Sequence, residues 1–184
     1  MSVRNTDQRW GLVSQAFHWV IFLLIVGAWL AFELHDDAPK HSPESLKWIL
    51  MHKSLGLTVF FLVWLRLAWR LANPTPKALV VSAWQNRLAV LTHWGLYALM
   101  VLMPVTGILM SAYGGRPVAW FGLFELPLSL PKDEALAKQF HGLHTDVFWP
   151  LLLALVGLHI VAALWHHFVV KDATLKRMLP GTKV

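Results

Sequence analysis

The chain has 184 residues, of which 57% are hydrophobic and 14% are charged, and its formal net charge at neutral pH is +6. Because charged residues make up roughly 25% of a typical soluble domain, this composition excludes a soluble α/β enzyme, a nucleic-acid-binding domain and a disordered chain. The sequence contains no cysteine, which excludes disulfides, thiolate metal sites, iron–sulfur clusters and the attachment motif of c-type haem.

Long apolar runs define the expected elements. Residues 88–115 and 147–170 contain no Asp, Glu, Lys or Arg, and each run exceeds the roughly 20 residues that span a bilayer as a helix. We expect membrane-spanning helices over residues 13–34, 46–71, 87–112 and 143–170, with Pro104 bending the third and Pro150 interrupting the fourth. The first is expected to be a true span, because no small-residue cleavage site follows it. The sequence thus predicts an all-α, integral membrane four-helix bundle in which residues 1–184 form one domain.

The charges in the loops predict the orientation. Four spans put both termini on one side of the membrane, which carries ten basic and two acidic residues, whereas the other side carries six basic and eight acidic residues. Basic loops stay in the cytoplasm, so we expect a multi-pass protein of the bacterial inner membrane with both termini cytoplasmic. The long loop before the fourth helix is rich in aromatic residues and is expected to lie on the outer membrane surface. The basic residues of the terminal side are Arg4, Arg9, Arg66, Arg70, Lys77, Arg87, Lys171, Lys176, Arg177 and Lys183.

Histidine is costly inside a bilayer and by default indicates a functional site. Zinc would require three or four converging ligands, and a proton relay would require carboxylates, which the helix interiors lack. A haem requires one imidazole on each face of its iron, which the facing helices of a bundle can supply. The alternative is that the histidines only hydrogen-bond between helices, and it stays open for His93 in particular. His35 and His41, in the first loop, are expected to be solvated. The histidines in or at the ends of the expected helices are His18, His52, His93, His144, His159 and His166.

These histidines pair by their depth in the membrane. His18 lies near the cytoplasmic end of the first helix and His159 in the cytoplasmic half of the fourth, whereas His52 lies at the outer end of the second. The partner of His52 on the fourth helix is His144 or His141, and we favour His144. On an ideal helix His144 and His159 are roughly 22 Å apart along the axis and about 60° apart around it, and a local bulge at the nearby proline can shift that phase. The depths predict two bis-histidine haem sites stacked across the bilayer.

Nine short stretches around these histidines and helix ends form one ordered pattern. They are residues 17–19 (FHW), 51–56 (MHKSLG), 66–70 (RLAWR), 73–76 (NPTP), 93 (H), 104–107 (PVTG), 158–167 (LHIVAALWHH), 171–172 (KD) and 175–180 (LKRMLP). Together, and over nearly the whole chain, they resemble the bacterial cytochrome b561 family of di-haem membrane proteins. The resemblance implies two b-type haems, one ligated by His18 and His159 and the other by His52 and a histidine of the fourth helix. One departure is the spacing of the two histidines of the fourth helix, which is fifteen or eighteen residues here and shorter in the family.

Some members of that family oxidise superoxide at the outer face and reduce ubiquinone, and the resemblance implies the same activity here. Superoxide is an anion, so Lys53, beside His52, and Arg116, in the outer loop, are candidates for attracting it. The resemblance points to His166, two helical turns beyond His159, as the residue that donates to a quinone carbonyl and delivers a proton. The alternatives are a haem-b electron-transfer subunit serving a separate dehydrogenase or periplasmic redox protein, and a transporter or assembly factor that uses its histidines structurally.

Overall fold

The computed structural model of the chain describes residues 2–79 and 82–182, so Lys183, one of the basic residues counted for orientation, lies outside the described residues. Within the described residues, four helical segments are long enough and apolar enough to cross a membrane, which confirms the all-α, four-helix prediction. These segments are α1 (Leu12–Asp37), α2 (Pro43–Leu71), α3 (Ala83–Tyr113) and a fourth segment, Glu134–Val170. The fourth consists of α4 (Glu134–Gly142), the π-helical η1 (Leu143–Phe148), α5 (Trp149–Trp165) and the π-helical η2 (His166–Val170).

The fourth segment begins earlier than the sequence predicts, at Glu134 rather than at residue 143. Its first turn is capped by Asp133, whose side chain accepts a hydrogen bond from the Leu136 amide at 3.0 Å, and Glu134 adds a negative charge at the helix start. Local capping therefore extends a helix that hydropathy alone assigns to the loop. The bulge expected near Pro150 is present as η1, which ends two residues before this proline.

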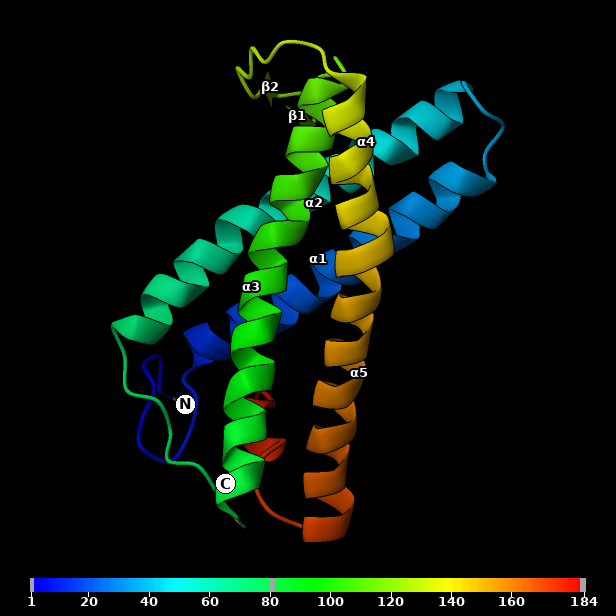
Figure 1. Ribbon diagram of the computed structural model, residues 1–184. Helices are drawn as coiled ribbons and strands as arrows, with labels where there is room; N and C mark the ends of the chain where they lie inside the picture. The colour runs from blue at the N-terminus through cyan, green and yellow to red at the C-terminus, as the bar shows by residue number, and fades with distance from the viewer. Residues whose placement is uncertain (1, 80–81, 183–184) are drawn as a thin grey trace.

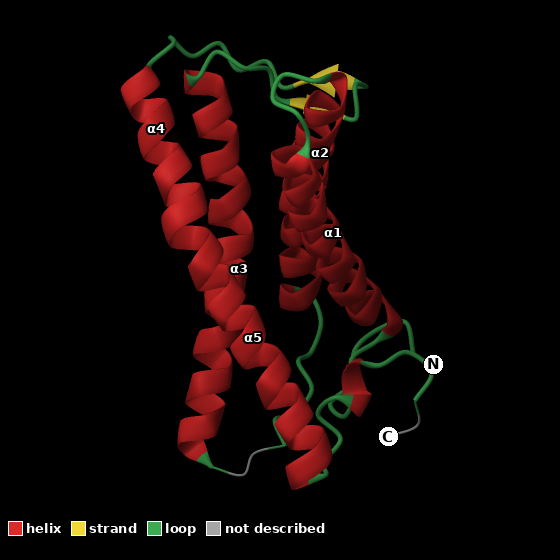
Figure 2. Ribbon diagram, turned by 90° about the vertical axis from the view of Figure 1, so that its right-hand side faces the viewer, coloured by secondary structure: helices red, strands yellow, loops and turns green. Residues whose placement is uncertain are grey.

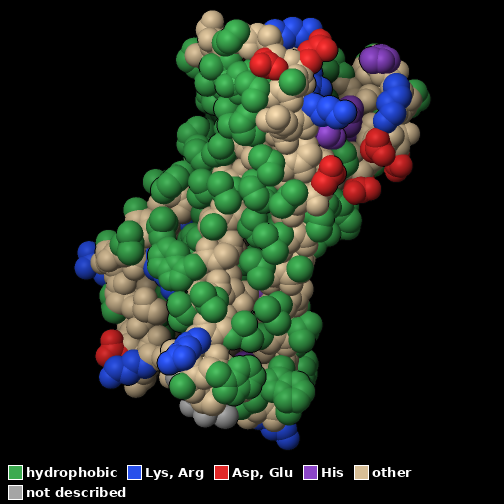
Figure 3. Space-filling view, in the orientation of Figure 1, with side chains coloured by type: hydrophobic (Ala, Val, Ile, Leu, Met, Phe, Trp, Pro, Cys, Tyr) green, Lys and Arg blue, Asp and Glu red, His purple; other side chains and the backbone are tan. Residues whose placement is uncertain are grey.

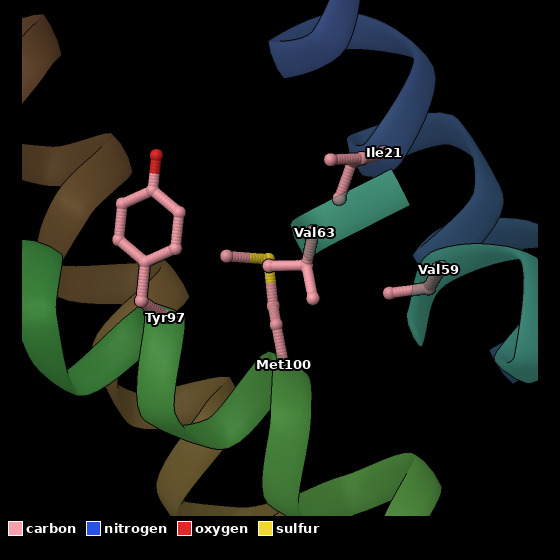
Figure 4. Packing of buried hydrophobic residues seen from close by; sticks show 5 residues of the cluster. All are labelled: Ile21, Val59, Val63, Tyr97 and Met100. Carbon is pink, nitrogen blue, oxygen red and sulfur yellow. The ribbon is translucent and has the colours of Figure 1, made fainter. Parts of the chain in front are cut away.

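The helices form two pairs. Figures 1 and 2 show α1 and α2 as an antiparallel pair, and α3 beside the fourth segment as a second pair. Helix α3 also contacts α2 and so joins the two pairs. Side chains of α1, α2 and α3 meet in a small buried cluster, shown in Figure 4, that contains Ile21, Val59, Val63, Tyr97 and Met100.

The flanks of the bundle expose apolar side chains. Leu23, Leu91 and Val161 each expose more than half of their surface, and Figure 3 shows hydrophobic groups covering the flank while charged groups gather toward the ends. In water this arrangement would be costly, because exposed apolar area lowers stability, whereas lipid tails solvate it. The fold therefore fits a bilayer.

Different structures close the two ends of the bundle. At one end the segment before α1 and the segment after η2 lie against the 72–79 connection, because the Lys77 amide donates to the carbonyl of Asp7 and the Arg177 side chain donates to the carbonyl of Lys77. The side chain of Gln15, which is 1% exposed, donates to the carbonyls of Trp10 and Arg177. At the other end, the loop that follows α3 forms a two-stranded sheet of β1 (Ala119–Trp120) and β2 (Phe124–Glu125). This loop is fixed to α2, because Trp120 donates to Thr58 Oγ1 and the amide of Phe121 donates to Ser54 Oγ.

Candidate functional site

One imidazole pair lies between α2 and η1. The ring centroids of His52 and His144 are 6.1 Å apart. Metal–imidazole bonds are about 2 Å long, so two imidazoles on opposite sides of one metal ion have ring centres about 6 Å apart. The structure thus brings His52 together with His144, at a spacing that fits one iron between them.

Both rings of this pair are oriented by hydrogen bonds at the nitrogen that would face away from a metal. The Nδ1–H of His52 donates to the carbonyl oxygen of Ala28 at 2.8 Å, and the Nδ1–H of His144 donates to the carbonyl oxygen of Met103 at 2.9 Å. The hydroxyl oxygen of Thr106 lies 3.1 Å from the same nitrogen of His144. Because carbonyl oxygens only accept, each Nδ1 carries the hydrogen and each Nε2 is left as a free ligand.

A cavity of about 560 Å³ adjoins this pair and is lined by residues of all four spans. Two glycines shape it. At Gly56, one helical turn beyond His52, an added Cβ would meet no atom within 4 Å, and at Gly107 it would lie 3.3 Å from Cε1 of His144. The first glycine keeps the cavity open and the second lets α3 approach the imidazole closely, so the two positions form a cradle for a flat apolar group.

The second imidazole pair lies between α1 and α5. The ring centroids of His18 and His159 are 6.0 Å apart, which fits the same metal–imidazole geometry. A third ring, that of His93 on α3, lies 5.4 Å from the ring of His159. Arg66 of α2 places Nη2 3.1 Å from Nδ1 of His18. Because a guanidinium only donates, this contact differs from the carbonyl contacts of the other pair.

His141 and His144, the two candidate partners of His52, lie in different surroundings. His141 is exposed and lines the cavity, while the ring of His144 is the one that faces His52. His144 lies within η1, and the wider π-helical turns that follow it change the angular phase between His144 and His159 that an ideal helix would give. Within residues 2–79 and 82–182 no cluster of three or more potential metal-ligating side chains occurs.

The candidate residues for the outer end lie near the His52–His144 pair. Lys53 lines the cavity and donates from Nζ to the carbonyl oxygen of Pro117 at 3.0 Å, next to the exposed Arg116. Three exposed carboxylates also line this cavity, so its charge is mixed; they belong to Glu33, Asp36 and Asp146.

His35 departs from its predicted environment. We expected a solvated loop histidine, but α1 extends to Asp37, and the half-buried His35 places Nδ1 2.8 Å from the hydroxyl oxygen of Ser45. The extension of the helix carries this side chain against the start of α2. His41 is exposed, as expected.

His166 lies in η2 at the end of the fourth segment, where it meets a carboxylate. Its Nδ1–H donates to Oδ2 of Asp172 at 2.6 Å, and both side chains are mostly buried. A left-handed backbone conformation at Lys171 (φ 59°) turns the chain back so that Asp172 reaches the histidine. Partial burial acts to raise the pKa of the Asp172 carboxyl, but hydrogen bonds from Thr174 and His166 outweigh it and hold that pKa below its ordinary value.

Sequence reasoning did not assign three residues that contact the candidate histidines. Thr106 contacts His144, Arg66 contacts His18, and Asp172 contacts His166. The sequence signals for two of them were weak, since Arg66 is a basic residue near a helix end and Asp172 is an acid just after one. Neither signal reveals which histidine the residue contacts, and no signal in the sequence pointed to Thr106.

Comparisons with known proteins find a family model and relatives that match nearly the whole chain. The family model described as prokaryotic cytochrome b561 matches residues 9–181. Cytochrome b561 homolog 2 of Escherichia coli (strain K12) is 34% identical over 185 residues, which cover 97% of this chain and 95% of the relative. Probable superoxide oxidase CybB of Yersinia pestis is 33% identical over 179 residues, covering 94% and 97%. Cytochrome b561 homolog 1 of Escherichia coli (strain K12) is 32% identical over 169 residues, covering 90% and 94%.

Proposed function

The chain belongs to the prokaryotic cytochrome b561 family, and from this premise we propose that it oxidises superoxide at the periplasmic face and passes the electrons through two haems to ubiquinone. Family membership makes it a multi-pass bacterial membrane protein of electron transfer that binds haem b. The number of haems, their ligands, the donor and the acceptor are the proposal.

The observation that supports this proposal is that one bundle holds two imidazole pairs, at different depths, and that the rings of each pair are at the distance that one metal ion would bridge. We assign His52 and His144 to one haem b and His18 and His159 to the other, with ring spacings of 6.1 and 6.0 Å. Haem b held by two imidazoles supplies one-electron transfer and leaves no open iron position for substrate. His144 and His159 are roughly 22 Å apart along the fourth segment, so the two sites divide the membrane thickness between them.

The periplasmic end is assigned to the His52–His144 pair, because the opposite end carries the termini and most of the basic loop residues. Lys53 is the residue that would draw superoxide toward this pair, since it lines the same cavity and directly follows His52. Arg116 would add to the positive potential from the neighbouring loop. The name of the Yersinia pestis relative, probable superoxide oxidase, supports this donor.

The quinone end is assigned to His166. Because Nδ1 of His166 is engaged by Asp172, Nε2 is the nitrogen left to hydrogen-bond with a quinone carbonyl, and a proton held there can be delivered on reduction. Trp165 and Phe168 beside it are exposed on the apolar flank, so a lipid-soluble substrate could approach this residue from the bilayer.

A second function has its own support. Glu33, Asp36 and Asp146 are exposed around the same cavity as Lys53. Their negative charge would repel superoxide but would attract a basic redox protein. A haem-b electron-transfer subunit that serves a separate dehydrogenase or periplasmic partner is therefore the alternative.

Rapid mixing of the purified, haem-loaded protein with superoxide distinguishes the two. We expect a b-type α-band to grow and then to collapse when a ubiquinone analogue is added. Lys53→Gln should slow the growth by about tenfold at low ionic strength. The matched control is Lys47→Gln, which removes an exposed lysine of α2 that does not line the cavity. If dithionite produces the band and superoxide does not, the electron-transfer subunit is the correct function.

A further inference from the structure

Two arginines lie one helical turn apart inside the second span. Arg66 and Arg70 are half-buried on α2, and neither forms an ion pair with any carboxylate of residues 2–79 and 82–182. Arg70 is partly satisfied by aromatic rings, because its guanidinium carbon lies 5.8 Å from the ring of Trp94 and 5.5 Å from that of Tyr97. Arg66 shares the Tyr97 ring at 5.5 Å and otherwise faces His18.

The contact between Arg66 and His18 leaves most of the hydrogen-bond donors of Arg66 unsatisfied. A guanidinium has five N–H donors in a rigid fork, and an imidazole nitrogen can accept only one of them. Two positive charges without a counter-ion are costly in a low-dielectric interior. An arginine fork binds an anion with two oxygens through two parallel hydrogen bonds, so such an anion would satisfy N–H donors of Arg66 that the single contact with His18 leaves unused.

The two imidazole pairs differ in the group that faces the Nδ1 nitrogen of their histidines. At the His52–His144 pair, each Nδ1 donates to a backbone carbonyl oxygen. At the other pair, Nδ1 of His18 faces a donor instead. A ligating imidazole favours an acceptor at its free nitrogen, so Arg66 has a better partner than His18 once that imidazole binds a metal.

We propose that Arg66, with Arg70 beside it, is the binding site for the carboxylates of the cofactor held by His18 and His159, and that it raises the reduction potential of that cofactor. This inference rests on the proposed function, through the His18–His159 assignment. Haem b carries two propionate carboxylates, and the paired arginines match them in number and charge. A fixed cation also favours the reduced form, since that form carries less positive charge.

Redox titration of the haem-loaded protein with chemical mediators tests the site. The potential of this haem is identified as the one that disappears in His18→Ala. In Arg66→Gln it should fall, so that the ratio of reduced to oxidised haem at a fixed potential drops roughly tenfold, or about 59 mV for one electron. The other potential should not move. Arg87→Gln removes an exposed arginine at the start of α3 and should leave both potentials unchanged.

Unchanged potentials in Arg66→Gln, or an equal fall in Arg87→Gln, overturn the proposal. If Arg66→Gln loses this haem and keeps the other, the site is supported, and Arg70→Gln must then lower the same potential; a potential unmoved by Arg70→Gln overturns it.

A membrane phosphate is the other source of an anion, and the lipid composition separates the two. The wild-type potential should be the same in vesicles of phosphatidylcholine alone and in vesicles that also contain phosphatidylglycerol. If the effect of Arg66→Gln appears only with the anionic lipid, the arginines bind headgroups and the proposal is wrong. The mediators replace superoxide and quinone, so the titration does not depend on either end of the proposed reaction.

Discussion

Replacement of His144 by alanine should remove one haem and leave the other. The imidazole of His144 lies 6.1 Å from that of His52, and its Nδ1 is fixed by the Met103 carbonyl, so the ligand is already in position. His141 is three residues earlier and exposed, which puts it about 4.5 Å further along the helix axis. It could replace His144 only if the fourth segment moved along its axis by that distance. The haem-to-protein ratio should therefore fall from about two to about one in His144→Ala, because a bis-histidine site needs both of its imidazoles.

The assay is the pyridine haemochromogen ratio to protein, combined with the reduced-minus-oxidised spectrum of the remaining haem. His141→Ala is the matched control and should keep both haems. Thr106→Val, which removes the hydroxyl near Nδ1 of His144 but leaves the Met103 carbonyl, should weaken retention of the same haem by about tenfold. Equal losses in His144→Ala and His141→Ala, or full retention in His144→Ala, would refute the assignment of the ligand.

Three further outcomes follow from the structure. Gly56→Leu should fill the cavity and displace one haem, whereas Gly157→Leu, at an exposed glycine with equal space around its Cα, should keep both; haem content measures the difference. Asp172→Asn should lower the melting temperature above about pH 4, because the pKa of Asp172 in the folded protein lies below its usual value, which is about 3.9. The difference in melting temperature between variant and wild type should close as the pH falls through that lower pKa. A gap that persists in strong acid would mean that the carboxylate contact with His166 is not its cause. The superoxide rate should fall as salt is added if Lys53 dominates the cavity potential, and a rate that rises with salt would assign that control to the surrounding carboxylates.

The fold could be predicted from the sequence wherever one physical constraint dominates. Charge-free runs of bilayer length leave the chain no option but helices, and the predicted spans agree with α1, α2 and α3 to within a few residues. The predicted start of the fourth segment was wrong, because residues 134–142 are polar and their helix depends on the Asp133 cap and on continuity with η1. Hydropathy measures transfer to lipid, and a polar helix that extends from the membrane is invisible to it.

The site could be predicted less completely than the fold. The levels of the histidines in the membrane could be predicted, whereas contacts between residues far apart in the sequence could not. Depth in the membrane is nearly linear in residue number, so it predicts which histidines share a level. Which ring faces which depends on helix rotation, and η1 alters that rotation in a way that only the folded chain reveals. The contacts of Arg66 and Thr106 join residues that are 48 and 38 positions apart in the sequence, and no local pattern encodes them.

The packing of the fourth segment explains why the cofactor and the fold depend on each other. The buried cluster is built from α1, α2 and α3, and within the described part of α5 the buried residue is Leu152. Yet this segment supplies a proposed ligand to each haem, and one of its ring contacts with α1, that of Trp149 with Trp29 at 6.3 Å, lines the cavity. A cavity of about 560 Å³ at this junction would forfeit dispersion contacts if it stayed empty. A haem held here by His52 and His144, as proposed, would supply the core that joins the fourth segment to the first two, and its binding would stabilise the bundle by mass action. Loss of either proposed ligand on this segment should loosen its packing as well as its electron path.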